Sequence, residues 1–148
     1  MHFVDAKSIL SVKNGMNIYR GCTHGCIYCD SRSDCYNMRH DFEDVEVKRN
    51  APELLEKALA SKRRLCMIGT GAMSDPYMHC EEKLRLTRRC LEIIDRHGFG
   101  VTVLTKSDMI LRDADLLCSI NSKAKAVVQM TLTTYDEDLC RIDRKSVV

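Results

Sequence analysis

The sequence predicts an α/β fold in which parallel strands alternate with helices. Short apolar runs alternate along the chain with segments whose apolar residues recur at helical spacing. A glycine-bearing or polar segment follows each of the first three apolar runs. The chain has no internal repeat, low-complexity tract or Gly/Ser linker. We therefore expect one domain over residues 1–148.

The first strand is predicted at residues 16–19, where it leads into the loop GCTHGCIYCD at 21–30. The glycines and polar residues of that loop exclude a long regular element there. Residues 41–49, DFEDVEVKR, alternate briefly between polar and apolar side chains. Because so many of these side chains are charged, the segment is interpreted as a surface connection.

A first helix is predicted to begin at Asn50, with Asn50 as its cap, Pro52 in its first turn and Glu53 favoured by the helix dipole. Its expected buried stripe is Leu54, Leu55, Ala58 and Leu59. The next strand is predicted at 65–68, LCMI, which is followed by Gly69-Thr70-Gly71. The unbroken apolar run indicates a strand that is buried on both faces.

Helical spacing then predicts a helix over 81–97 that ends at Gly98 in a left-handed conformation. A third strand is expected at 101–104, a third helix at 110–120 and a fourth strand at 126–132. The apolar stripes of the two helices are Leu84, Leu86, Cys90, Leu91, Ile93 and Ile94, and then Leu116, Leu117 and Ile120. Asp136 is placed to begin a further helix.

Parallel strands bring the loops at their carboxyl ends to one edge of the sheet. Three segments are predicted to meet there: the cysteine loop, GTGAMSDPY at 69–77, and Thr105-Lys106-Ser107. The pattern leaves open whether the sheet is open or curls into a barrel.

Composition limits the classes of partner. The 23 basic and 21 acidic side chains leave a formal charge of +2, so no global field attracts a polyanion, and nucleic acid is neither excluded nor supported. No apolar run reaches the ~18 residues of a membrane span, and the first ten residues lack a signal core. We expect a cytoplasmic protein. The nine cysteines, odd in number and clustered, indicate reduced thiols with a metal function.

Cys22, Cys26 and Cys29 follow the pattern Cys-x3-Cys-x2-Cys, with Tyr28 before the third cysteine. A cubane iron–sulfur cluster has four irons, so three thiolates leave one iron without a protein ligand. A small molecule with an amine and a carboxylate can bind that iron. Three closely spaced cysteines are therefore what a cluster with an open iron requires.

The alternative is a structural zinc site that uses the three thiolates with His24, Asp30 or Cys35. Zinc sites usually combine two short pairs of ligands, and the second pair is missing here. Cys66, Cys90 and Cys118 lie on apolar stripes and are expected to be small core residues.

The chain resembles the radical S-adenosylmethionine (radical SAM) superfamily over residues 7–139. YRGCTHGCIYCDSRS, GTGAMSDPY and VTVLTKSDMILRDADLL resemble the spore photoproduct lyase-related branch of that superfamily. The resemblance implies a radical SAM core domain at 1–148 that forms the N-terminal portion of a partial (β/α)6 TIM-like barrel. Residues 1–148 hold about four of the six β/α units, which suggests a C-terminally truncated chain.

The resemblance further implies a 4Fe-4S cluster held by Cys22, Cys26 and Cys29, whose fourth iron is chelated by the methionyl part of S-adenosylmethionine. An electron from a donor such as flavodoxin or ferredoxin then cleaves the sulfonium. The products are methionine and a 5′-deoxyadenosyl radical, which abstracts hydrogen from a substrate that the sequence does not identify.

Four further residues receive roles from the same resemblance. Ser74 and Asp75 are expected to contact the methionine amino group, Lys106 its carboxylate and Tyr28 the adenine. An ammonium is a natural partner for a carboxylate, and a hydroxyl or carboxylate accepts from an amine. Taken alone, Asp75-Pro76 is also a common turn opener that Ser74 can cap, and Lys106 can be a solvated side chain.

The chain differs from spore photoproduct lyase at one functional position. In spore photoproduct lyase, a cysteine that returns a hydrogen atom lies two positions before the residue that matches Ser74, and Ala72 stands there in this chain. The sequence therefore assigns no catalytic side chain and does not imply the DNA-lesion reaction. Three hypotheses stay open: a radical SAM enzyme, a zinc or iron–sulfur module without turnover, and an inactive fragment.

Overall fold

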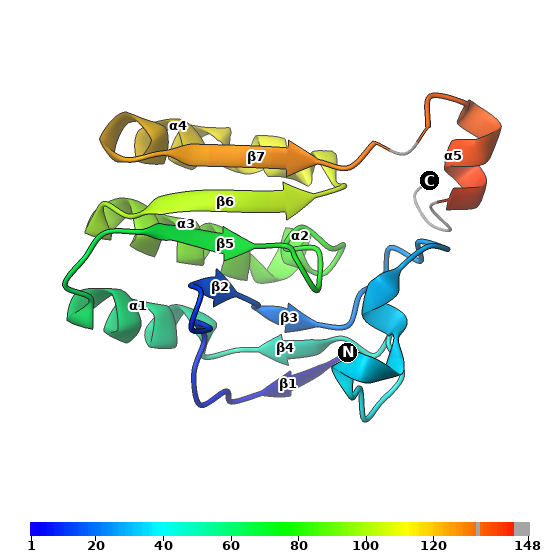
Figure 1. Ribbon diagram of the computed structural model, residues 1–148, viewed down its shortest axis with the longest axis horizontal. Helices are drawn as coiled ribbons and strands as arrows, with labels where there is room; N and C mark the ends of the chain where they lie inside the picture. Colours follow the sequence, from blue (N-terminus) through cyan, green and yellow to red (C-terminus); the bar gives the residue numbers. More distant parts are fainter. Residues whose placement is uncertain (133, 144–148) are drawn as a thin grey trace.

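The computed structural model describes residues 1–132 and 134–143, and its strands form two sheets (Figure 1). The larger sheet has the order β2-β5-β6-β7 and is parallel throughout. Its strands are β2 (Gly15–Met16), β5 (Met67–Thr70), β6 (Gly100–Thr105) and β7 (Ala126–Met130). The smaller sheet has the order β1-β4-β3, with β1 (His2–Val4), β4 (Glu46–Lys48) and β3 (Tyr19–Arg20).

The predicted α/β class is confirmed, because helices connect the parallel strands in sequence order. The connecting helices are α1 (Ala51–Ser61), α2 (Glu81–Leu84), α3 (Leu86–His97) and α4 (Ala114–Lys123). Figure 1 shows α1, α3 and α4 on one face of the larger sheet. The described strands form an open sheet, as in part of a TIM-like barrel. No described helix is both long and apolar enough to cross a bilayer.

The predicted first strand is divided between the two sheets. β2 pairs with β5 in the larger sheet, whereas β3 pairs antiparallel with β4 in the smaller one. The chain passes between the sheets at Asn17 and Ile18, and the buried Ile18 packs in the shared core. The switch of partner explains why one apolar run forms two short strands.

The expectation that 41–49 is only a surface connection is wrong. Within it, β4 is the central strand of the smaller sheet, between β3 and the parallel strand β1, which the sequence did not predict. Val45 and Val47 are buried in the core, whereas Glu46 and Lys48 are half-buried. The alternation was therefore a true strand signal, and the charged residues lie on the less buried face.

The first helix begins where the sequence predicts. Pro52 lies in its first turn, and Leu55 and Leu59 are fully buried. The Asn50 side chain does not cap the helix, because its amide instead exchanges two 2.9 Å hydrogen bonds with the backbone of Ala6.

The strand after this helix begins two residues later than predicted, at Met67. Its expected burial on both faces is wrong, because Leu65 and Met67 are exposed and only Ile68 and Thr70 are buried. A Cβ atom built on Gly69 would meet no atom within 4 Å, so the other face of β5 is open at that point.

The helix predicted over 81–97 is broken into α2 and α3 at Arg85, which has a left-handed φ of 51°. The buried carboxylate of Glu81 accepts a 3.1 Å hydrogen bond from the backbone N–H of Thr87, in the first turn of α3. This bond satisfies a donor that a continuous helix would pair internally. Gly98 ends α3 with a φ of 70°, as predicted.

The remaining elements follow the prediction with shifted boundaries. β6 covers the predicted third strand, and β7 ends at Met130 rather than at residue 132. The third helix begins only at Ala114, because residues 108–113 form the 3-10 helix η3 (Asp108–Asp113). Cys118 is exposed, so its assignment to the core is wrong. The expected last helix is α5 (Glu137–Asp143), and Asp136 Oδ1 accepts a 2.9 Å hydrogen bond from Leu139 N.

Candidate functional site

The three segments predicted to meet do line one pocket of about 270 Å³, at the carboxyl ends of β5 and β6. All seven residues selected from the sequence lie in its wall. They are Cys22, Cys26, Tyr28, Cys29, Ser74, Asp75 and Lys106. The parallel strand order therefore brings together residues that are up to 84 positions apart in the sequence.

The cysteine loop is anchored against the segment that precedes β4. Gly21 has a φ of 89°, and a Cβ atom there would lie 2.4 Å from the carbonyl oxygen of Phe42, so only glycine fits. The next residue, Cys22, donates its backbone N–H to that same oxygen at 3.0 Å. Cys26 is buried and Cys29 is half-buried. Burial raises the pKa of the Cys22 thiol.

The three cysteine sulfurs are more widely spaced than the ligands of one zinc ion. Among residues 1–132 and 134–143, the one group of three metal-ligating side chains with ligand atoms all within 4.8 Å contains no cysteine. Zn–S bonds of about 2.3 Å place tetrahedral sulfurs roughly 4 Å apart. At least one pair of the three cysteine sulfurs therefore lies farther apart than 4.8 Å.

Asp75 organises the pocket wall. Its Oδ1 accepts hydrogen bonds from Tyr77 N at 2.9 Å and from Thr105 Oγ1 at 2.6 Å. Its Oδ2 accepts from Lys106 N at 2.8 Å and lies 3.3 Å from His24 Nε2. Burial by itself raises the pKa of Asp75, but these contacts outweigh it and hold the pKa below its usual value. A carboxylate offers about four acceptor positions, and hydrogen bonds from the protein fill three of them here.

Ser74, the neighbour of Asp75, differs from it in hydrogen bonding. Its side chain lines the pocket and is only 7% exposed, yet its Oγ has no hydrogen-bond partner within the described part of the chain. Leaving a buried hydroxyl unpaired costs about 1–3 kcal/mol. Such a group in a pocket wall is a candidate ligand contact.

Lys106 is not the solvated side chain that its sequence position alone allowed. Its Nζ lies 4.0 Å from the centroid of the Tyr28 ring, in a cation–π contact. The contact joins the cysteine loop to the end of β6, because Tyr28 lies between Cys26 and Cys29 in the sequence. It places a cation in the pocket wall.

His24 and Thr105 are pocket residues whose roles the sequence did not reveal. His24 is buried and connects the cysteine loop to Asp75, whereas the sequence offered it only as a ligand of the alternative zinc site. Thr105 ends β6 as a buried polar residue and donates to the same carboxylate. Its position as a polar residue at the end of an apolar strand could have identified Thr105 as a pocket residue.

Gly71 lets the backbone of the segment after β5 pack directly against the end of β6. Its φ is 98°, and a Cβ atom there would lie 1.8 Å from the carbonyl oxygen of Leu104. We expect Gly71→Ala to lower the free energy of unfolding by about 2–4 kcal/mol, because the backbone must shift. Urea unfolding measures this change. Gly69→Ala is the matched control, since its Cβ meets nothing within 4 Å, and equal midpoints for the two variants would contradict the expectation.

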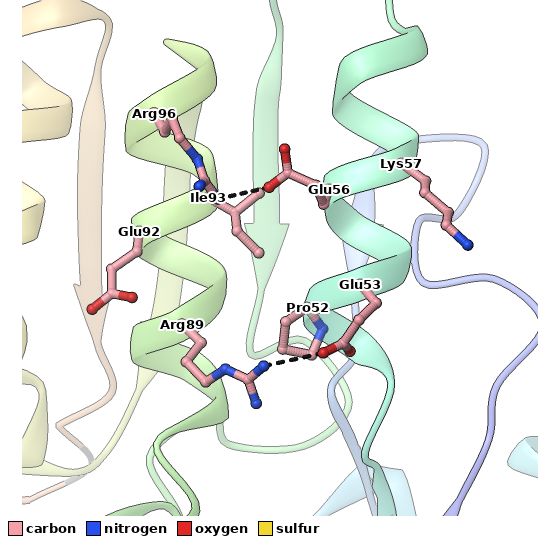
Figure 2. Close-up of a pocket in the computed structure, with 8 residues that line it drawn as sticks. All are labelled: Pro52, Glu53, Glu56, Lys57, Arg89, Glu92, Ile93 and Arg96. Carbon is pink, nitrogen blue, oxygen red and sulfur yellow. Dashed lines mark hydrogen bonds and ion pairs between the residues drawn. The ribbon is translucent and has the colours of Figure 1, made fainter.

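A second hollow of about 580 Å³ lies between α1 and α3 (Figure 2). Four of its charged side chains form two ion pairs: Arg89 lies 3.1 Å from Glu53, and Arg96 lies 2.7 Å from Glu56. These exposed ion pairs are worth at most about 1 kcal/mol each. No cysteine lines the hollow, and we interpret it as a charged groove between packed helices.

Comparison with known proteins gives one family and several relatives. The family described as the Radical SAM superfamily matches residues 16–147. An uncharacterized protein of Methanocaldococcus jannaschii is 33% identical over 138 residues, which cover 92% of this chain and 50% of that protein. Uncharacterized proteins of Mycobacterium tuberculosis and Mycobacterium bovis are 29% identical over 134 residues, or 85% of this chain and 39% of theirs. The chain thus spans half or less of these curated relatives, and no solved structure matches it.

Proposed function

The chain belongs to the radical SAM superfamily, and from this premise we propose that its pocket binds a 4Fe-4S cluster and S-adenosylmethionine. When bound, the cluster supplies the electron that cleaves S-adenosylmethionine to methionine and a 5′-deoxyadenosyl radical. The proposed reaction is hydrogen abstraction from a substrate by that radical. The observation that carries the proposal is that three cysteines, a lysine ammonium and a serine hydroxyl meet in one pocket, and the hydroxyl has no hydrogen-bond partner among the described residues.

The cysteines act as the cluster ligands in this proposal. Cys22, Cys26 and Cys29 all line the pocket, and they supply three thiolates. The sequence has no second short pair of ligands of the kind that zinc sites usually combine, which supports a cluster over a single zinc ion. Three thiolates would leave one iron of the cluster without a protein ligand, and Ser74 lines the same pocket as the cysteines.

The remaining pocket residues divide into ligand contacts and a positioning residue. Ser74 Oγ accepts a hydrogen bond from the methionine amino group, because it is buried in the wall without a partner in the described chain. Lys106 pairs with the methionine carboxylate, and Tyr28, which already stacks on that ammonium, lies against the adenine. Asp75 positions these groups, because its carboxylate oxygens are already engaged by the protein.

We assign the chain to the spore photoproduct lyase-related branch, with a reaction other than DNA-lesion repair. Ala72 lines the pocket at the position of that lyase's hydrogen-returning cysteine, and an alanine methyl group cannot take that role. The electron donor in this proposal is a flavodoxin or ferredoxin, since a single electron must reach the cluster.

The test of the proposal is anaerobic reconstitution with iron and sulfide, followed by electron paramagnetic resonance of the reduced protein. A reduced cubane signal that changes when S-adenosylmethionine is added supports an open iron bound by that molecule. A cluster whose resonance signal does not change when S-adenosylmethionine is added would instead support an iron–sulfur module without turnover. A protein that takes up zinc but no cluster would contradict the proposal.

Removal of the Ser74 hydroxyl should weaken S-adenosylmethionine binding. We expect Ser74→Ala to raise the dissociation constant about fivefold to tenfold, the equivalent of one neutral hydrogen bond, while cluster content stays unchanged. Titration of the change in the resonance signal measures the constant. Ser122→Ala, at an exposed serine of α4, is the control. Equal constants in both variants would remove Ser74 from the binding site.

A further inference from the structure

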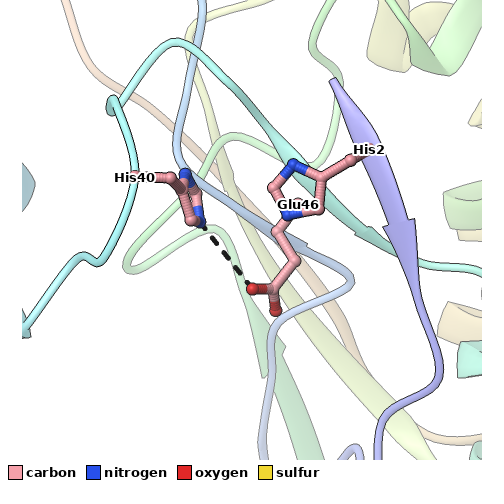
Figure 3. Close-up of side chains that lie close together, drawn as sticks. All are labelled: His2, His40 and Glu46. Atoms are coloured by element: carbon pink, nitrogen blue, oxygen red, sulfur yellow. Dashed lines mark ion pairs between the residues drawn. The ribbon is translucent and has the colours of Figure 1, made fainter.

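A second group of metal-ligating side chains lies on the smaller sheet and shares no residue with the cysteine pocket. His2 on β1 and Glu46 on β4 are direct partners in the parallel register, and His40 reaches them from the segment before β4. Their ligand atoms all lie within 4.8 Å of one another. Figure 3 shows the two imidazole rings and the carboxylate turned toward the same space.

Both imidazoles are held so that Nε2 can bind a metal. His2 Nδ1 lies 2.9 Å from Asp44 Oδ2, and His40 Nδ1 lies 3.0 Å from the carbonyl oxygen of Asp41. An oxygen acceptor at Nδ1 keeps the proton on that atom and leaves the lone pair on Nε2. Metal-binding histidines are usually oriented by such a carboxylate or carbonyl partner.

Contacts within the group leave room for an ion. His40 Nε2 lies 3.8 Å from Glu46 Oε2, which is too long for a hydrogen bond. Two ligands at about 2.1 Å from one tetrahedral metal are roughly 3.4 Å apart, so the His40–Glu46 pair needs to close by only a few tenths of an ångström. The ligand atoms of the whole group lie within 4.8 Å of one another, so binding also requires His2 to adjust. The His40 and Glu46 side chains are 21% and 20% exposed and His2 is 41% exposed, so an ion can enter from solvent.

Three charged groups lie close to these ligands. Asp44 places a carboxylate behind His2, and the N-terminal ammonium of Met1, 2.6 Å from Asp44 Oδ1, offsets its charge. Arg20 is the register partner of Glu46 on β3, but its guanidinium donates to the carbonyl oxygens of Tyr36 and Asn37, at 2.8 and 3.2 Å. These bonds direct the guanidinium toward the backbone at 36–37.

We propose that His2, His40 and Glu46 bind one divalent transition-metal ion of the Zn²⁺ type, with further coordination positions open to solvent. Two histidines and one carboxylate are a known ligand set for such ions, and imidazole disfavours Mg²⁺ and Ca²⁺. The ion joins β1, β4 and the segment just before β4 that contains His40. That segment includes Phe42, whose carbonyl oxygen holds the backbone of Cys22.

The experiment is a Co²⁺ titration of the full chain followed by absorption spectroscopy. Thiolate-bound Co²⁺ absorbs intensely in the near ultraviolet, whereas imidazole and carboxylate ligands give only the weaker visible bands, so the two kinds of site are distinguished. We expect visible bands that saturate at one ion per chain. Glu46→Gln should weaken this binding at least tenfold, and Asp44→Asn, which loosens His2, by about tenfold or more.

His97→Gln is the matched control, because His97 Nε2 also faces a glutamate, Glu56 at 2.7 Å, but belongs to no three-ligand group in the described residues. Equal affinity in Glu46→Gln and His97→Gln would overturn the proposal, as would binding with the thiolate spectrum alone. If a variant fails to fold, imidazole nitrogen resonances of the unaltered chain decide instead. Zn²⁺ must then shift those of His2 and His40 but not that of His97.

Discussion

Cys22→Ser, Cys26→Ser and Cys29→Ser are each expected to abolish the iron–sulfur cluster. A cubane held by three thiolates already has one iron without a protein ligand, and loss of another thiolate leaves two irons open. Iron and sulfide content after anaerobic reconstitution should fall from about four of each per chain to near zero. The reduced resonance signal should disappear with them.

Two exposed cysteines are the controls for this prediction. Cys118 lies on α4 and Cys35 lies shortly after the cysteine loop. Serine at either position should leave the cluster content unchanged, and circular dichroism should show that all five variants are folded. If Cys35→Ser lost the cluster while Cys29→Ser kept it, the proposed ligand set would be wrong.

Glu81→Ala is expected to lower the free energy of unfolding by about 3–5 kcal/mol. Glu81 is 0% exposed, and its carboxylate accepts from the Tyr19 hydroxyl, from Thr87 N at 3.1 Å and from Arg112 Nη2 at 3.0 Å. Burial raises the pKa of Tyr19, so its hydroxyl remains a donor throughout the neutral range. Without the carboxylate, three buried or half-buried donors lose their acceptor at once.

Urea unfolding measures this loss, and Glu82→Ala is the matched control because the neighbouring side chain is exposed. Glu81→Gln should lie between the two variants, since the amide oxygen still accepts but Arg112 loses its opposite charge. Unfolding midpoints that are equal for Glu81→Ala and Glu82→Ala would show that the network does not stabilise the fold.

Much of the order of elements follows from local patterns. The stripe that contains Leu91 and Ile94 and the glycine at 98 predicted α3 and its end, because helical periodicity and a left-handed cap are properties of neighbouring residues. The apolar run at 101–104 predicted β6, because such a run is likewise a property of neighbouring residues. The cysteine spacing likewise identified the loop from eight consecutive positions.

The boundaries that the sequence missed depend on partners far along the chain. β4 looked like a charged connection, and only its pairing with β1 and β3 makes it a central strand. The break at Arg85 follows from the contacts of one buried carboxylate with α3, Tyr19 and Arg112. Neither effect is visible in a window of neighbouring residues, because partners far along the chain, β1 for β4 and Arg112 and Tyr19 for Glu81, take part in both.

The sequence by itself determined the fold class, the three cysteines and the edge of the sheet where the functional loops meet. Only the tertiary structure decided which pocket residues are already engaged: it surrounds Asp75 with protein donors and leaves Ser74 Oγ unpartnered in the described chain. It also brought His2, His40 and Glu46 together. Periodicity and motif spacing are local and can be recognised in sequence, whereas hydrogen-bond satisfaction depends on donors that only folding brings within about 3 Å.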